Sequence, residues 1–146
     1  IHKLAEASEA ALETSKVLEK NRITVFGETV TWKQYRDLYT VKDTMEQWIE
    51  KKFMSKVFFF RINEFIEMAG REQALKLCKE IQLDDMGCTK WRAFLAYSAE
   101  RNIAGTYKGE SRQRIITEIT AKLAEWLIIF GSHLKIPLWT ILYNRR

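Results

Sequence analysis

The chain has 146 residues, of which 47% are hydrophobic and 29% charged, with one proline and six glycines. This length suits one domain with its own core, and this composition excludes a disordered or disulfide-dense chain. Helix-forming residues dominate and helix breakers are scarce. We therefore expect a single, mostly α-helical domain over residues 1–146, folded as a compact multi-helix bundle with at most one short β-hairpin near residues 23–30.

The net charge of +5 is unevenly distributed along the chain. Residues 1–70 carry 11 basic and 11 acidic side chains, whereas residues 71–146 carry 13 basic and 8 acidic ones. Attraction to a polyanion is therefore expected to be strongest in the second half of the chain.

Few residues suit catalysis or metal binding. Cys78 and Cys88 form no CxxC pair, and His2 and His133 lie far apart in no recognisable motif. The only acidic pair, Asp84-Asp85, has no partner carboxylate at a telling spacing. We expect no enzyme, no catalytic residue, no metal, no cofactor and no small-molecule substrate.

The longest apolar stretch runs from Leu123 to Ile141. It is broken by Glu125, Gly131, His133, Lys135 and Pro137. We therefore expect no membrane span and no signal peptide. The expected location is the cytoplasm, or the nucleus if the source is eukaryotic or viral.

The first expected elements are a helix over residues 3–20 and a hairpin over residues 23–30, with its turn at Gly27-Glu28. Thr31 can then cap a helix, because Gln34 follows three residues later as a capping box requires. The apolar positions of residues 31–53 fit two alternatives, which are one continuous helix and a pair of short helices.

Several further elements follow from apolar periodicity and helix breakers. We expect helices over 57–68 (ended by Gly70), 71–82, 89–101, 112–130 (capped by Ser111, ended by Gly131) and 137–143, with loops at 84–87 and 102–111. Phe58-Phe59-Phe60 points three aromatic rings around much of one helix, so it belongs either to the core or to an oligomer contact.

Residues 31–50, TWKQYRDLYTVKDTMEQWIE, resemble the helix-turn-helix of excisionase-type and other small phage or plasmid DNA-binding proteins. Thr31, Thr40, Val41, Trp48 and Ile49 fall at the matching positions. The resemblance implies a helix-turn-helix unit at residues 31–52 whose second helix enters the major groove.

The same resemblance implies roles for individual side chains. Lys42 and Gln47 would lie on the outer face of the second helix, where Gln47 could read an adenine. Phosphate contacts would come from Lys33, Arg36, Lys51 and Lys52.

A second basic feature, independent of the resemblance, spans residues 101–114. Arg101, Lys108, Arg112 and Arg114 surround two glycines and Tyr107. Such a loop could hold a phosphate backbone while Tyr107 stacks on a base, or it could be a solvated loop.

The sequence therefore predicts a small basic accessory or regulatory protein that binds DNA or RNA and acts as a homodimer or with a protein partner. The alternative is a helical adaptor that docks a protein partner through exposed aromatic surface. Gathered cations would favour the first, whereas interspersed charges would favour the second.

Overall fold

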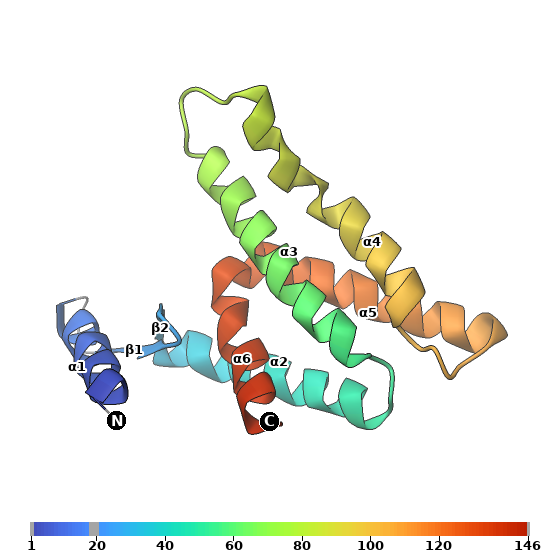
Figure 1. Cartoon of the computed structure of the whole chain (residues 1–146), viewed down its shortest axis with the longest axis horizontal. Helices are drawn as coiled ribbons and strands as arrows, with labels where there is room; N and C mark the ends of the chain where they lie inside the picture. The colour runs from blue at the N-terminus through green and yellow to red at the C-terminus, as the bar shows by residue number, and fades with distance from the viewer. Residues whose placement is uncertain (1, 18–20, 146) are drawn as a thin grey trace.

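The computed structural model describes residues 2–17 and 21–145 and confirms the mostly α-helical class with one short antiparallel hairpin (Figure 1). In chain order the elements are α1 (His2–Val17), β1 (Arg22–Val25), β2 (Glu28–Thr31), α2 (Trp32–Glu50), α3 (Lys56–Leu75), the 3-10 helix η1 (Leu83–Lys90), α4 (Trp91–Asn102), α5 (Gly109–Phe130), the 3-10 helix η2 (Gly131–Leu134) and α6 (Lys135–Asn144). Residues 18–20 of the first predicted helix lie outside the described residues.

The hairpin and the capped start of α2 form where local chemistry predicts them, but the turn is Phe26-Gly27 and not Gly27-Glu28, because Glu28 already pairs with Val25 in the ladder. Ile23 lies opposite Val30 in the ladder, and Gly27 adopts a φ of +79° in the turn, where glycine avoids the clash that a Cβ atom would cause. The Thr31 hydroxyl accepts from the backbone N–H of Gln34, whose side-chain oxygen accepts from the N–H of Thr31 at 3.0 Å. The predicted capping box is confirmed.

The helix-turn-helix unit predicted at residues 31–52 is wrong, because α2 is one continuous helix from Trp32 to Glu50. At the predicted turn, the Thr40 hydroxyl donates to the carbonyl of Arg36 one turn earlier within the helix. A single continuous helix buries Leu38, Val41, Met45 and Trp48 together on one face. No residue at the predicted turn favours a left-handed conformation, so nothing interrupts the helix.

Gly70 does not end a helix either, because α3 continues through it to Leu75. The neighbouring Ala69 is buried, and this tertiary packing outweighs the roughly 1 kcal/mol that glycine costs inside a helix. The predicted helix over 71–82 is therefore the last turn of α3 followed by residues outside any helix. The predicted Ser111 cap is also wrong, because α5 begins at Gly109 with Lys108 at its N-cap.

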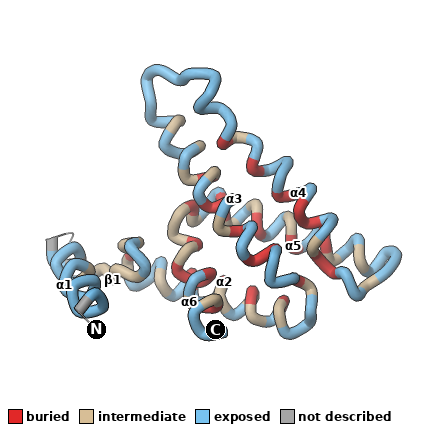
Figure 2. The backbone as a smooth tube through the Cα atoms, viewed as in Figure 1, coloured by how far each residue is buried: buried red, intermediate tan, exposed pale blue. Residues whose placement is uncertain are grey.

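The core lies around α3, which packs against α4, α5, η2 and α6. Buried positions follow the facing sides of these helices in Figure 2, and the largest enclosed side chains include Phe58, Ile62, Trp91 and Leu123. By contrast, each described side chain of α1 is exposed except Ala11, which is half-buried. The main packing of the fold is therefore between residues 30 and 142.

The large aromatic side chains are not all equally buried. Phe58 and Phe59 are core residues, but the third ring of the triplet, Phe60, is 63% exposed. Trp48 is buried, whereas its stacking partner Trp126, with ring centroids 5.2 Å apart, is half-buried.

Candidate functional site

Two loops that are distant in sequence meet at one end of the molecule. The N–H of Ala104 donates to the carbonyl of Phe53 at 2.7 Å, and Met54 pairs with Ile103 in an isolated antiparallel bridge. The Tyr107 hydroxyl donates to the Lys51 carbonyl at 3.4 Å. We call this surface, formed by residues 51–55 and 103–108, the loop junction.

Local backbone geometry fixes the shape of the loop junction. Lys52 adopts a φ of +58° and Ala104 a φ of +52°, so the chain turns sharply at both positions. The N–H of Phe53 donates to the Trp48 carbonyl at 2.8 Å, which satisfies a free carbonyl at the end of α2. Met54, Ile103 and Ala104 are all buried. The loop junction is therefore anchored to the core by its own side chains.

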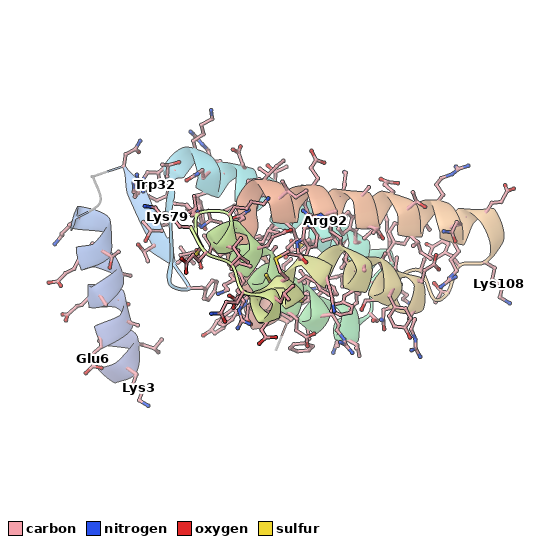
Figure 3. All side chains as sticks on the ribbon, turned by 90° about the horizontal axis from the view of Figure 1, so that it is seen from above. Lys3, Glu6, Trp32, Lys79, Arg92 and Lys108 are labelled. Carbon is pink, nitrogen blue, oxygen red and sulfur yellow. The ribbon has the colours of Figure 1, made fainter. Side chains whose placement is uncertain are left out.

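Three exposed cations project from this anchored backbone, namely Lys51, Lys52 and Lys108. In the part of the chain that the structure describes, none of them forms an ion pair. Figure 3 shows Lys108 at the end of the molecule opposite Lys3 and Glu6 of α1. Their charge is thus available to an external anion.

The neighbouring ends of α4 and α5 add the other predicted arginines. Arg101 donates to the Tyr97 hydroxyl at 2.8 Å, and Arg114 is exposed and forms no ion pair with any described residue. Arg112 donates to the main-chain carbonyl of Glu100 and lies 3.8 Å from its carboxylate. Arg112 therefore ties α5 to α4, whereas Arg114 remains available to a ligand.

Around the loop junction the balance of charge is positive. Segments 50–56 and 100–114 together contain seven basic and three acidic side chains. A surface of this kind attracts the phosphates of a nucleic acid, and the attraction is weakened by salt.

Tyr107 does not have the predicted role of a free stacking ring. It is half-buried and packs edge-on against Phe53, with ring centroids 5.3 Å apart. Its hydroxyl is also engaged by the Lys51 carbonyl. Tyr107 therefore holds the two loops together.

The residues predicted from the helix-turn-helix resemblance are distributed along the whole of α2. Lys33 and Arg36 are exposed in its first turns, whereas Lys51 follows its last residue. At a rise of 1.5 Å per residue, Lys51 lies about 27 Å along the helix axis from Lys33. Gln47 is exposed near the end of the helix. The structure thus brings Lys51 and Lys52 to the loop junction and leaves Lys33 and Arg36 distant from it.

Lys42 is held by its own helix. Its ammonium lies 3.4 Å from Glu46, 3.8 Å from Asp43 and 4.4 Å from the centroid of the Tyr39 ring. Burial alone would lower the pKa of Lys42, but Glu46 and Tyr39 outweigh this effect and raise the pKa. The charge of Lys42 is therefore largely neutralised within α2.

Sequence reasoning missed one polar cluster that joins the hairpin to η2. The Glu28 carboxylate accepts from the Ser132 hydroxyl at 3.0 Å, and the same oxygen lies 3.0 Å from His133 Nδ1. Lys135 is 4.0 Å from the second carboxylate oxygen. Because Ser132 and His133 both contact the Glu28 carboxylate, these side chains link β2 to the bend between α5 and α6.

That bend depends on Gly131, which adopts a φ of +54°. A Cβ atom at this position would lie 2.8 Å from the side-chain oxygen of Gln73. The Gln73 amide donates in turn to the Ile128 carbonyl at 3.2 Å. The predicted end of the long helix at Gly131 is confirmed.

Among the described residues, no group of three or more histidine, cysteine, aspartate or glutamate side chains is arranged to hold a metal ion. Comparison of the chain with protein-family models, with curated proteins and with solved structures finds no match. Function is therefore inferred from the chain's own geometry.

One helical run in the described part of the chain, Gly109–Asn144, is long and apolar enough by composition to cross a membrane. In its most apolar window, 39% of the residues are buried inside the protein. The run includes the bend at Gly131, where α5 gives way to η2 and α6. The absence of a membrane span stays a prediction.

Proposed function

We propose that this protein is a non-enzymatic accessory protein that binds the phosphate backbone of a nucleic acid at the loop junction. The observation that carries the proposal is the hydrogen-bonded union of the two loops, which places Lys51, Lys52 and Lys108 on one anchored surface. Phosphate contacts supply most of the binding energy in such complexes and carry no sequence information directly. The expected binding is therefore strongly salt-dependent and weakly sequence-specific.

A charge-reversal pair tests this surface directly. In Lys51→Glu/Lys108→Glu both substitutions fall on exposed side chains of the loop junction. The matched control, Lys33→Glu/Arg36→Glu, makes the same change in net charge on exposed side chains at the other end of α2. The two variants thus separate a local contact from a general effect of charge.

The measurement is the fluorescence anisotropy of a labelled single-stranded oligonucleotide, and of the matching duplex, at low and moderate salt. Removal of one lysine–phosphate interaction should reduce the slope of log affinity against log salt by roughly 0.7 for single strands and 0.9 for duplex. The loop-junction variant should therefore lose about two such units of slope, and the control clearly less. Equal losses in the two variants would remove the loop junction as the binding surface.

A second candidate function, a protein–protein adaptor, is favoured by the far end of the α3–α4 pair. Leu77 and Leu83 are 88% and 91% exposed there, and Ile81 and Met86 are exposed beside them in sequence. Exposed apolar side chains grouped in this way are typical of interaction surfaces. The two candidates separate in the titration above, because an adaptor would leave the oligonucleotide unbound even at low salt.

A further inference from the structure

A pocket of about 290 Å³ lies among the end of α2, the start of α3 and the end of α6. Its walls are predominantly apolar and are formed by Ile49, Met54, Phe59, Phe60, Ile141 and Leu142. We call it the α6 pocket. Its volume is near the lower end of the range for small-molecule sites and is too small for a helix, whose diameter with side chains is about 10 Å.

The charged groups that line the α6 pocket are both cations, Lys56 and Arg145. Neither forms an ion pair with any residue in the described ranges 2–17 and 21–145, and no carboxylate lines the pocket. Three larger surface hollows in those ranges differ in this respect. Their linings include Asp84 and Asp85, Glu110 and Glu118, or Glu67.

The apolar lining of the α6 pocket is also incompletely covered. Phe60 follows two buried phenylalanines on α3, yet it exposes most of its ring at the pocket. A ligand that buries this exposed apolar surface gains favourable free energy from the hydrophobic effect. A negative group on the same ligand could also pair with Lys56 and Arg145. An apolar chain with one anionic end meets both requirements.

We propose that the α6 pocket binds a free medium-chain carboxylate, with its alkyl chain against Phe59, Phe60 and Leu142 and its carboxylate between Lys56 and Arg145. One water molecule occupies roughly 30 Å³ in the liquid, which is close to the volume of a methylene group. The pocket volume of about 290 Å³ therefore accommodates roughly ten groups of this size. The predicted ligand is therefore an acyl chain of about ten carbons. This binding is independent of the nucleic-acid proposal, because it uses neither Lys51 nor Lys108.

The test is a titration of the whole chain with decanoate, below the concentration at which decanoate forms micelles, followed by calorimetry and by methyl NMR. We expect saturable binding, with shifts of the methyl signals of Ile49, Ile141 and Leu142. Decanol carries the same alkyl chain without the charge, and should bind about tenfold more weakly or worse.

The variant Lys56→Gln/Arg145→Gln should lower the decanoate affinity to that of decanol. Both side chains are exposed, so the fold is expected to be retained. The matched control Lys33→Gln/Arg36→Gln removes the same charge elsewhere and should bind decanoate as the parent does.

Three results would overturn the proposal. These are no methyl shift up to about 1 mM decanoate, equal affinities for decanoate and decanol, or shifts confined to residues outside the α6 pocket. The variant Lys51→Glu/Lys108→Glu should bind decanoate normally, so failure of the nucleic-acid proposal is distinguishable from failure of this one.

Discussion

The two ends of the α3–α4 pair are built differently. At one end, the loop junction is tied by the Ala104–Phe53 hydrogen bond and anchored by buried Met54 and Ile103. At the other end, which we call the tip (residues 76–90), every residue from 76 to 87 is exposed (Figure 2). The α3–α4 pair therefore has one end held by buried side chains and one end whose side chains are mostly exposed.

The charges at the two ends differ in the same way. The loop junction presents lysines that form no ion pair with any described residue. The tip instead carries both signs in equal number, with Lys76, Lys79 and Lys90 beside Glu80, Asp84 and Asp85. A surface that holds a polyanion needs charges of one sign on a backbone that does not rearrange. This difference favours the loop junction for a nucleic acid and the tip for an apolar contact.

The largest expected effect is the loss of Trp48, which anchors the loop junction. Its indole is buried against Trp126, and the substitution removes this packing but keeps the main-chain hydrogen bond from the Phe53 N–H to the Trp48 carbonyl. Trp48→Ala should lower the free energy of unfolding by about 3–5 kcal/mol in urea denaturation. Trp32→Ala, at an exposed position of the same helix, is the control and should cost less than about 1 kcal/mol. Similar losses in both variants would contradict the anchoring role of Trp48.

A smaller effect is expected at Glu72 of α3, which lies just before the tip in the chain. Its carboxylate accepts from the Trp91 indole at 2.7 Å and from Arg92 at 2.9 Å. Glu72→Gln should therefore lower the free energy of unfolding by about 1.5–3 kcal/mol at neutral pH, because it weakens hydrogen bonds to a charged group. Glu80→Gln, on the exposed tip, should leave it nearly unchanged.

The Glu72 effect should also depend on pH. Burial alone would raise the pKa of Glu72, but the hydrogen bonds from Arg92 and Trp91 and the charges of Arg92 and Lys76 lower it below its ordinary value. A lowered pKa adds stability that is present above the ordinary glutamate pKa of about 4.3 and is lost as the pH falls through the pKa of the folded state. The stability difference between parent and Glu72→Gln should therefore shrink on acidification. A difference that grows instead would contradict the assignment.

Backbone geometry at the loop junction predicts a gain in stability. Lys52 has a left-handed φ of +58°, whereas the adjacent Lys51 has a φ of −74°. Lys52→Gly should raise the free energy of unfolding by about 0.5–1 kcal/mol, because glycine adopts positive φ without steric cost. Lys51→Gly should lower it by a similar amount, and two changes of the same sign would contradict the geometry.

The smallest expected effect is at the tip. Leu77→Ser/Leu83→Ser should change the free energy of unfolding by less than about 0.5 kcal/mol, because both side chains are almost fully exposed. Leu95→Ala, on the buried side of α4, should cost about 2–5 kcal/mol by the same measurement. A large loss in the double tip variant would show that the tip is packed and would remove the contrast between the two ends.

Short-range chemistry fixed the elements that the sequence predicted best. Gly27 set the hairpin turn, the Thr31–Gln34 capping box set the start of α2, and Gly131 set the end of α5. Each of these signals acts within a few residues, because a cap or a positive φ satisfies or bends only the adjacent backbone. The helical class and the cations of residues 51–52 and 101–114 were likewise readable from the sequence.

Tertiary packing decided what the local signals left open. The apolar stripe of α2 fitted two arrangements, and burial of Leu38, Val41, Met45 and Trp48 together selected the continuous helix. The same packing carried α3 through Gly70 and turned Tyr107 toward Phe53. The loop junction itself depends on a hydrogen bond between residues 53 and 104, about fifty positions apart in the chain. No periodicity or cap reports such a contact, because the meeting of the two loops is set by how the helices between them pack.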